Sequence, residues 1–156
     1  MIRNITLISL LFILTAAPAL ALEFPLGPRV GYTHWDGINQ MHFGIHAKLG
    51  EILPNVALTP NIELGFGAGY TIVTLNGDLA YQFTELTTAP WGFYAGGSLS
   101  FNYLDHDLNE GNVDLGFSAI IGGTRMMSNG HEVLGEIRLG ILDSPDFKLT
   151  FGYTFF

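Results

Sequence analysis

The sequence predicts an all-β fold: a closed eight-stranded antiparallel up-and-down transmembrane barrel, preceded by a cleavable signal peptide. Three observations predict it. Segments of about ten residues alternate between apolar and polar residues, which is the period of a β-strand. Short groups of Gly, Pro, Asn and Asp separate these segments. Aromatic residues gather near the ends of the segments, where water meets lipid in membrane barrels.

The composition excludes several classes of protein. The chain has 156 residues, which suits one domain. It contains no cysteine, so disulfides, thiolate metal sites and cysteine nucleophiles are absent. Its 14 acidic residues outnumber its 6 basic residues, which argues against nucleic acid as a partner. Beyond the first segment, no stretch of about 20 residues is apolar enough for a membrane helix.

The first 21 residues have the features of a secretory signal peptide. Arg3 provides a positive charge, residues 5–14 form an apolar core, and cleavage after Ala19 or Ala21 fits the small-x-small pattern. An uncleaved anchor helix is the alternative, but the apolar run is short for a membrane span. We therefore expect residues 1–21 to direct export through the inner membrane and residues 22–156 to form the barrel.

Eight segments are expected to form the strands. Their parity places them at residues 28–35, 41–49, 58–66, 73–83, 91–103, 112–122, 132–141 and 147–155. Pro60 interrupts the third segment. Because a closed barrel has no edge that tolerates a missing N–H, we expect a bulge there or a strand that begins at Asn61. The connecting segments, such as "DGIN" and "GEILPN", are short and are expected to be turns.

The apolar parity is expected to face lipid, and the polar parity to face the lumen. The polar faces are rich in Gly, Ser, Thr and Asn and carry fewer charges than a solvated surface does. Their charges have both signs, as expected for ions that pair inside a narrow barrel. The predicted interior charge network consists of Arg29, Lys48, Glu63, Asp78, Asp114, Glu132, Glu136, Arg138 and Lys148. The same assignment requires Leu79, Leu99 and Phe151 to point outward.

Aromatic residues on the apolar parity are sorted by their position along the strands. One rim of the barrel is expected to carry Tyr81, Phe83, Trp91, Phe93, Tyr153 and Phe155. Aliphatic residues separate this group from a second aromatic group near the other rim. Two aromatic girdles around an aliphatic band are typical of the lipid-facing surface of membrane barrels. We therefore expect these six side chains to lie at one membrane interface.

Several stretches resemble small outer-membrane β-barrel proteins, the porin-like family: "LGEILPNVALTPNIELGFG", "LNGDLAYQF", "WGFYAGG" and "PDFKLTFGYTFF". The resemblance covers essentially the whole chain after the signal. It implies a barrel in the bacterial outer membrane, surrounded by outer-membrane lipid and lipopolysaccharide. "GYTF" is similar to the C-terminal signature that the barrel assembly machinery recognises, although Phe156 adds one residue beyond it. The family implies no shared catalytic residues, and we expect no cofactor.

The expected function is structural, or an interaction at the cell surface. An eight-stranded barrel encloses a lumen just wide enough for its own side chains, so a wide pore is not expected. A narrow, gated ion path is the alternative interpretation of the interior charges. Asp105, Asp107 and Glu110 are candidate ligands for a divalent cation shared with lipopolysaccharide phosphates. Their spacing does not match an EF-hand, so a solvated loop is the simpler interpretation.

Two other functions stay open. A lipid-modifying outer-membrane hydrolase would need a His, a Ser and a carboxylate within hydrogen-bond reach at one rim. His34 and His106 are expected near the outer rim with Ser144 as the nearest serine, but no motif joins them. A soluble periplasmic barrel that binds an apolar ligand would show the same alternation with its apolar parity inside.

Overall fold

The computed structural model describes residues 24–86, 88–106 and 109–156, with side chains described outside 104–112. The predicted signal peptide and Asp107 therefore lie outside the described residues. Within these ranges, no helix has the length and apolar character to cross a membrane.

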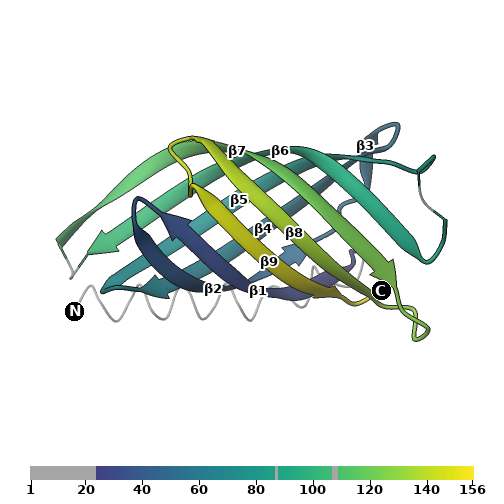
Figure 1. Ribbon diagram of the computed structural model, residues 1–156, viewed down its shortest axis with the longest axis horizontal. Helices are drawn as coiled ribbons and strands as arrows, with labels where there is room; N and C mark the ends of the chain where they lie inside the picture. Colours follow the sequence, from purple (N-terminus) through teal and green to yellow (C-terminus); the bar gives the residue numbers. More distant parts are fainter. Residues whose placement is uncertain (1–23, 87, 107–108) are drawn as a thin grey trace.

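The described residues form eight long strands and one short one, all in a single sheet (Figure 1). They are β1 (Leu26–Trp35), β2 (Ile38–Ala47), β3 (Glu51–Leu53), β4 (Val56–Gly67), β5 (Tyr70–Gln82), β6 (Trp91–His106), β7 (Asn109–Met126), β8 (Glu132–Leu142) and β9 (Phe147–Thr154). Sequential long strands pair antiparallel, and the first strand, β1, pairs with the last, β9. The predicted closed, eight-stranded up-and-down barrel is confirmed.

The short strand β3 lies where the sequence predicted a turn. It pairs with the start of β4 through Glu51 and Ala57, and Asn55 turns the chain between them with a φ of 61°. All three residues of β3 are exposed, so they lack the alternation of burial that would have marked them as a strand. Because β2 pairs directly with β4, the eight long strands form the closed ring, and β3 is paired with β4 alone.

The predicted break at Pro60 is wrong. β4 begins at Val56, and Pro60 pairs in register with Gly77 of β5 without a bulge. Leu58 donates its backbone N–H to Gly50, on the side of β4 away from β5. Strand alternation directs the Pro60 nitrogen to that same side, and the ladder with β2 has already ended at the pair His46–Asn61. No ladder hydrogen bond is lost there, so the strand tolerates the proline.

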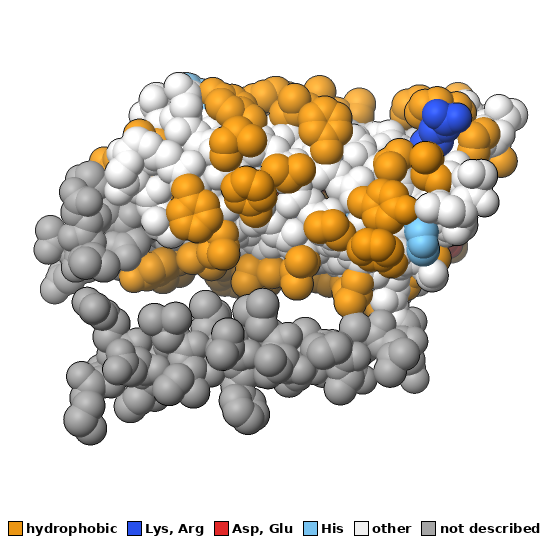
Figure 2. All heavy atoms as spheres, turned by 90° about the horizontal axis from the view of Figure 1, so that it is seen from below, with side chains coloured by type: hydrophobic (Ala, Val, Ile, Leu, Met, Phe, Trp, Pro, Cys, Tyr) orange, Lys and Arg blue, Asp and Glu red, His pale blue; other side chains and the backbone are white. Residues whose placement is uncertain are grey.

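The apolar parity forms the outer wall of the barrel. Leu79, Leu99 and Phe151 are exposed to 43, 49 and 57%, so all three point away from the lumen. Figure 2 shows hydrophobic side chains spread along the wall, with Lys and Arg visible on this face only near one end. This arrangement excludes the soluble barrel with an apolar interior, because an exposed apolar surface of this extent is unfavourable in water.

The two ends of the barrel differ. We call the end with the C-terminus the C-terminal rim; it includes segments 48–55, 83–86, 88–90 and 127–131 (Figure 1). The opposite end, the distal rim, includes the two-residue turns 36–37 and 68–69. At the first of these, φ is 47° at Asp36 and 79° at Gly37, as in the tight turns that suit the twist of a hairpin. β6 and β7 are the longest strands, and they extend beyond the others at the distal rim (Figure 1).

Candidate functional site: the filled lumen

The polar parity fills the lumen with its own side chains. Strand alternation sends every second residue inward, and these residues are mostly Ser, Thr, Asn, His and charged side chains. Ser98, Asn102, Ser118 and Thr154 are completely buried. The predicted interior without a wide pore is confirmed, because side chains from non-adjacent strands contact one another across the lumen.

Arg29 of β1 reaches three carboxylates on three other strands. Its Nε lies 2.9 Å from Glu63 Oε1 of β4, and its Nη2 donates to Glu136 Oε1 of β8 at 2.9 Å. Its Nη1 lies 3.9 Å from Asp78 Oδ2 of β5. Arg29 therefore connects the first strand to the middle and to the end of the chain.

Arg138 of β8 binds two of the same carboxylates from the other side. Its Nη2 donates to Asp78 Oδ2 at 2.8 Å and to Glu136 Oε1 at 3.0 Å. Its Nη1 donates to Asn76 and Ser98 at 2.9 and 2.7 Å. Lys148 of β9 forms an ion pair with Glu63. We call the six residues Arg29, Glu63, Asp78, Glu136, Arg138 and Lys148 the charge network; its three cations balance its three anions.

The other three predicted interior charges lie outside this network. Lys48 pairs with Glu132 at the C-terminal rim, where the Lys48 side chain is partly exposed. Asp114 of β7 is half-buried opposite Asn102 of β6. Among the described side chains, no ion pair includes Asp114. The sequence pattern predicted that all nine charged residues face the lumen, but it did not indicate which six would form the charge network.

Tyr94 is a member of the site that sequence reasoning did not identify. Its hydroxyl donates to Glu136 Oε2 at 2.8 Å, and its ring is buried. The signal was its parity, because Tyr94 is an aromatic residue on the polar face of its strand. Such an exception indicates an aromatic side chain that points into the lumen and needs a partner for its hydroxyl.

The buried histidines each bind hydroxyl groups. His42 lies between Thr33 at 2.8 Å and Thr150 at 3.1 Å, and His46 lies 2.8 Å from Thr154. These contacts join β2 to β1 and β9 inside the barrel. No group of three or more metal-binding side chains occurs among the described residues. Both histidines are buried and hydrogen-bonded at the seam of the barrel.

The six predicted girdle residues lie near the C-terminal rim, at the ends of β5 and β9 and the start of β6. The rings of Tyr81 and Phe83 are 5.3 Å apart, and those of Tyr153 and Phe155 are 5.1 Å apart. The Arg125 guanidinium lies over the Trp91 ring, with its Cζ atom 5.0 Å from the centre of the ring. Phe93 is exposed on the wall close to this group.

Of the remaining candidate residues, the structure describes the side chains of His34 and Ser144 only. The side chains of Asp105, His106 and Glu110 lie outside the described residues, as Asp107 does. His34 Nδ1 is 2.7 Å from Asn39 Oδ1, and Ser144 donates to the carbonyl of Phe117. His34 and Ser144 are therefore hydrogen-bonded to other groups, whereas a hydrolase mechanism would need them to contact each other.

The close approach between Gly122 and Tyr94 gives a first prediction. A Cβ added at Gly122 would lie 2.2 Å from Tyr94 Cζ, so Gly122→Ala must displace the ring and break its hydrogen bond to Glu136. We expect the free energy of unfolding in urea to fall by about 1–3 kcal/mol. Gly135→Ala is the control, since its Cβ would lie 3.7 Å from the Phe151 ring. Equal losses in both variants would contradict the prediction.

Three solved structures are similar to this barrel. The crystal structure of Neisserial surface protein A (NspA) aligns with a TM-score of 0.67 and 12% identity, over 84% of this chain and 94% of NspA. The Yersinia pestis outer membrane protein Ail aligns with a TM-score of 0.50 and 12% identity, over 85% of this chain and 100% of Ail. The outer membrane enzyme PagL aligns with a TM-score of 0.49 and 14% identity, over 83% and 97%. No family's sequence model and no curated protein sequence matches the chain.

The chain thus has the fold of the small eight-stranded outer-membrane barrels. The apolar wall and the charge-filled lumen agree with that fold. Together they define a closed eight-stranded β-barrel with an apolar outer wall, whose interior is occupied by its own side chains.

Proposed function

We propose that the protein is a resident of the bacterial outer membrane that has a structural or surface-interaction role, and that it is neither a wide pore nor an enzyme. The charge network carries this proposal. Its six ionised side chains join opposite walls of the lumen between the two rims. Breaking such pairs leaves charges buried without a partner, so the network is expected to stay closed.

The proposal extends to the surroundings of the barrel. Outer-membrane lipid is the surrounding that suits the exposed apolar wall. We propose further that Asp105, Asp107 and Glu110 share a divalent cation with lipopolysaccharide phosphates. Phe151, Tyr153 and Phe155 form the outer face of the last strand. We propose that this face is recognised by the barrel assembly machinery during insertion.

Two measurements on the refolded mature chain test the proposal. The folded barrel should migrate differently on a denaturing gel before and after boiling, because closed barrels resist the detergent until heated. In planar bilayers, the same sample should give no stepwise conductance. Identical mobility would overturn the membrane barrel, whereas large conductance steps would overturn only the closed lumen.

A third measurement tests for lipid modification. Expression in a bacterial host should leave the mass spectrum of lipid A unchanged, and His106→Ala should have no effect on it. A change in lipid A that His106→Ala abolishes would replace the structural role with that of a hydrolase.

A further inference from the structure

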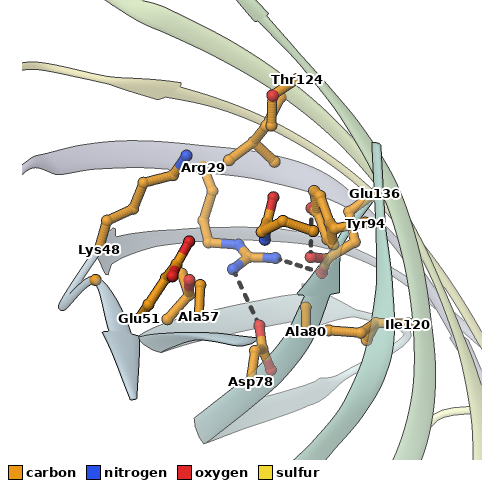
Figure 3. Close-up of a pocket in the computed structure, with 14 residues that line it drawn as sticks. Arg29, Lys48, Glu51, Ala57, Asp78, Ala80, Tyr94, Ile120, Thr124 and Glu136 are labelled. Atoms are coloured by element: carbon orange, nitrogen blue, oxygen red, sulfur yellow. Dashed lines mark hydrogen bonds and ion pairs between the residues drawn. The ribbon is translucent and has the colours of Figure 1, made fainter. Parts of the chain in front are cut away.

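A cavity of about 140 Å³ lies in the lumen between the charge network and the C-terminal rim (Figure 3). Arg29, Asp78 and Glu136 line its inner end. Lys48, Gln82 and Thr124 line its outer end, close to where their strands finish. The cavity is therefore a pocket that opens toward one rim and is closed at its base by ion pairs.

One wall of this cavity is apolar, although the lumen is otherwise polar. Ala80, Tyr94 and Ile120 form a buried apolar cluster, and Leu134 is buried beside the same cavity. Among the described residues, Ile72 and Pro145 are the other buried apolar side chains, and both lie toward the distal rim. All four wall residues are on the parity that elsewhere carries polar groups. Water forms no hydrogen bonds to these apolar side chains, so the wall favours contact with an apolar ligand group.

The base of the cavity offers one free hydrogen-bond donor. Within the described structure, Arg29 Nη1 makes no hydrogen bond and lies 3.9 Å from Asp78 Oδ2. The oxygens of Glu136 are already occupied: Oε1 accepts from Arg29 and Arg138, and Oε2 accepts from Tyr94. Arg29 Nη1 can therefore donate a hydrogen bond to a ligand at the base, where Asp78 Oδ1 is the carboxylate oxygen that is buried without a hydrogen-bond partner.

The charges at the base also select against an anionic ligand. A carboxylate would lie beside Asp78 and Glu136, whose charges are balanced by the cations of the network. Adding a fourth anion to three cations and three anions would leave one charge unpaired in the interior. An uncharged acceptor, such as a hydroxyl or carbonyl oxygen, does not disturb this balance.

We propose that this cavity binds a small, uncharged amphiphile, with a hydroxyl or carbonyl group toward Arg29 and an aromatic or short aliphatic group against Ile120 and Leu134. The volume suits such a ligand, because an apolar cavity of about 150 Å³ in another protein holds benzene. The entrance at the C-terminal rim would admit the ligand from one side of the membrane only.

The experiment uses benzyl alcohol as the probe and the refolded, methyl-labelled mature chain in deuterated detergent. Methyl signals of Ile120 and Leu134 should shift and saturate as benzyl alcohol is added. Two internal controls accompany them: Ile72 reports binding elsewhere in the lumen, and the outward-facing Ile121 reports partition into the micelle. Toluene, which lacks the hydroxyl group, should bind more weakly.

Matched variants make the test specific. Ala80→Leu fills the cavity without changing its charges and should weaken binding at least about tenfold. Ala95→Leu makes the same change on the outer wall of the neighbouring strand and should leave binding unchanged. If Ala80→Leu does not fold, Ala57→Leu fills the cavity from the neighbouring strand β4, where Ala57 pairs with Ala80.

Three outcomes would overturn the proposal. The shifts of Ile120 and Leu134 could fail to saturate, they could be equal to those of Ile72, or they could persist in the filled variants. Each would mean that benzyl alcohol does not bind specifically in this cavity. None of these outcomes changes the gel mobility or the conductance on which the proposed function is tested.

Discussion

Replacing Arg138 by methionine should lower the free energy of unfolding of the barrel by about 3–5 kcal/mol. Arg138 donates to Asp78 and Glu136, and both carboxylates stay buried when the guanidinium is removed. Methionine retains much of the side-chain length, so the loss is mainly that of the charge and its hydrogen bonds. Urea titration in detergent or liposomes, followed by tryptophan fluorescence, measures the change.

Arg125→Met is the matched control for this experiment. Arg125 is exposed at the C-terminal rim, and its contact is with the ring of Trp91. A cation–π contact at an exposed site contributes about 0.5–1 kcal/mol, so the loss should stay within that range. If Arg138→Met costs no more than Arg125→Met, the charge network does not stabilise the barrel as described.

Leu99→Arg is expected to be the second most damaging change, with a loss of about 2–4 kcal/mol in a lipid bilayer. Leu99 lies in the middle of β6 and faces outward, opposite Phe117 of β7. An arginine there must either remain in hydrocarbon or distort the bilayer to reach water. Unfolding of the variant in liposomes of fixed composition measures this cost.

Val113→Arg provides the comparison at the edge of the membrane. Val113 also faces outward, but it lies near the distal end of β7. Arginine near an interface costs about 0–1 kcal/mol, so this variant should be close to the native protein. A similar cost at both positions would show that the wall around Leu99 is not embedded in lipid.

The fold could be predicted largely from the sequence because the barrel obeys one local rule. The side-chain period of two places Leu79 and Phe151 outside and Glu63 and Arg138 inside, whatever the neighbouring strands are. The rule fails where burial does not alternate, as in β3, whose residues are all exposed. The rule also gave a wrong prediction for Pro60. The Pro60 nitrogen points toward β2, but the β2–β4 ladder ends at Asn61, and the local pattern does not reveal where a neighbouring ladder ends.

The pairing inside the lumen could not be predicted in the same way. Parity identified Arg29 and Glu136 as inward-facing, but 107 positions separate them in the sequence. Their contact depends on the stagger of the strands around the closed barrel, which no local pattern encodes. The same geometry brings Tyr94 to Glu136 and leaves Asp114 outside the network.

The position of Arg29 on the first strand has a consequence for how the barrel forms. Its partners are on β4, β5 and β8, and Lys148 on β9 completes the set. A curved sheet whose first and last strands have not yet met would hold several of these ions without counterions. Pairing of β1 with β9 and neutralisation of the buried charges are therefore expected to occur together. A sheet in which these two strands are unpaired is expected to be unstable in the membrane, because buried ions without counterions are costly.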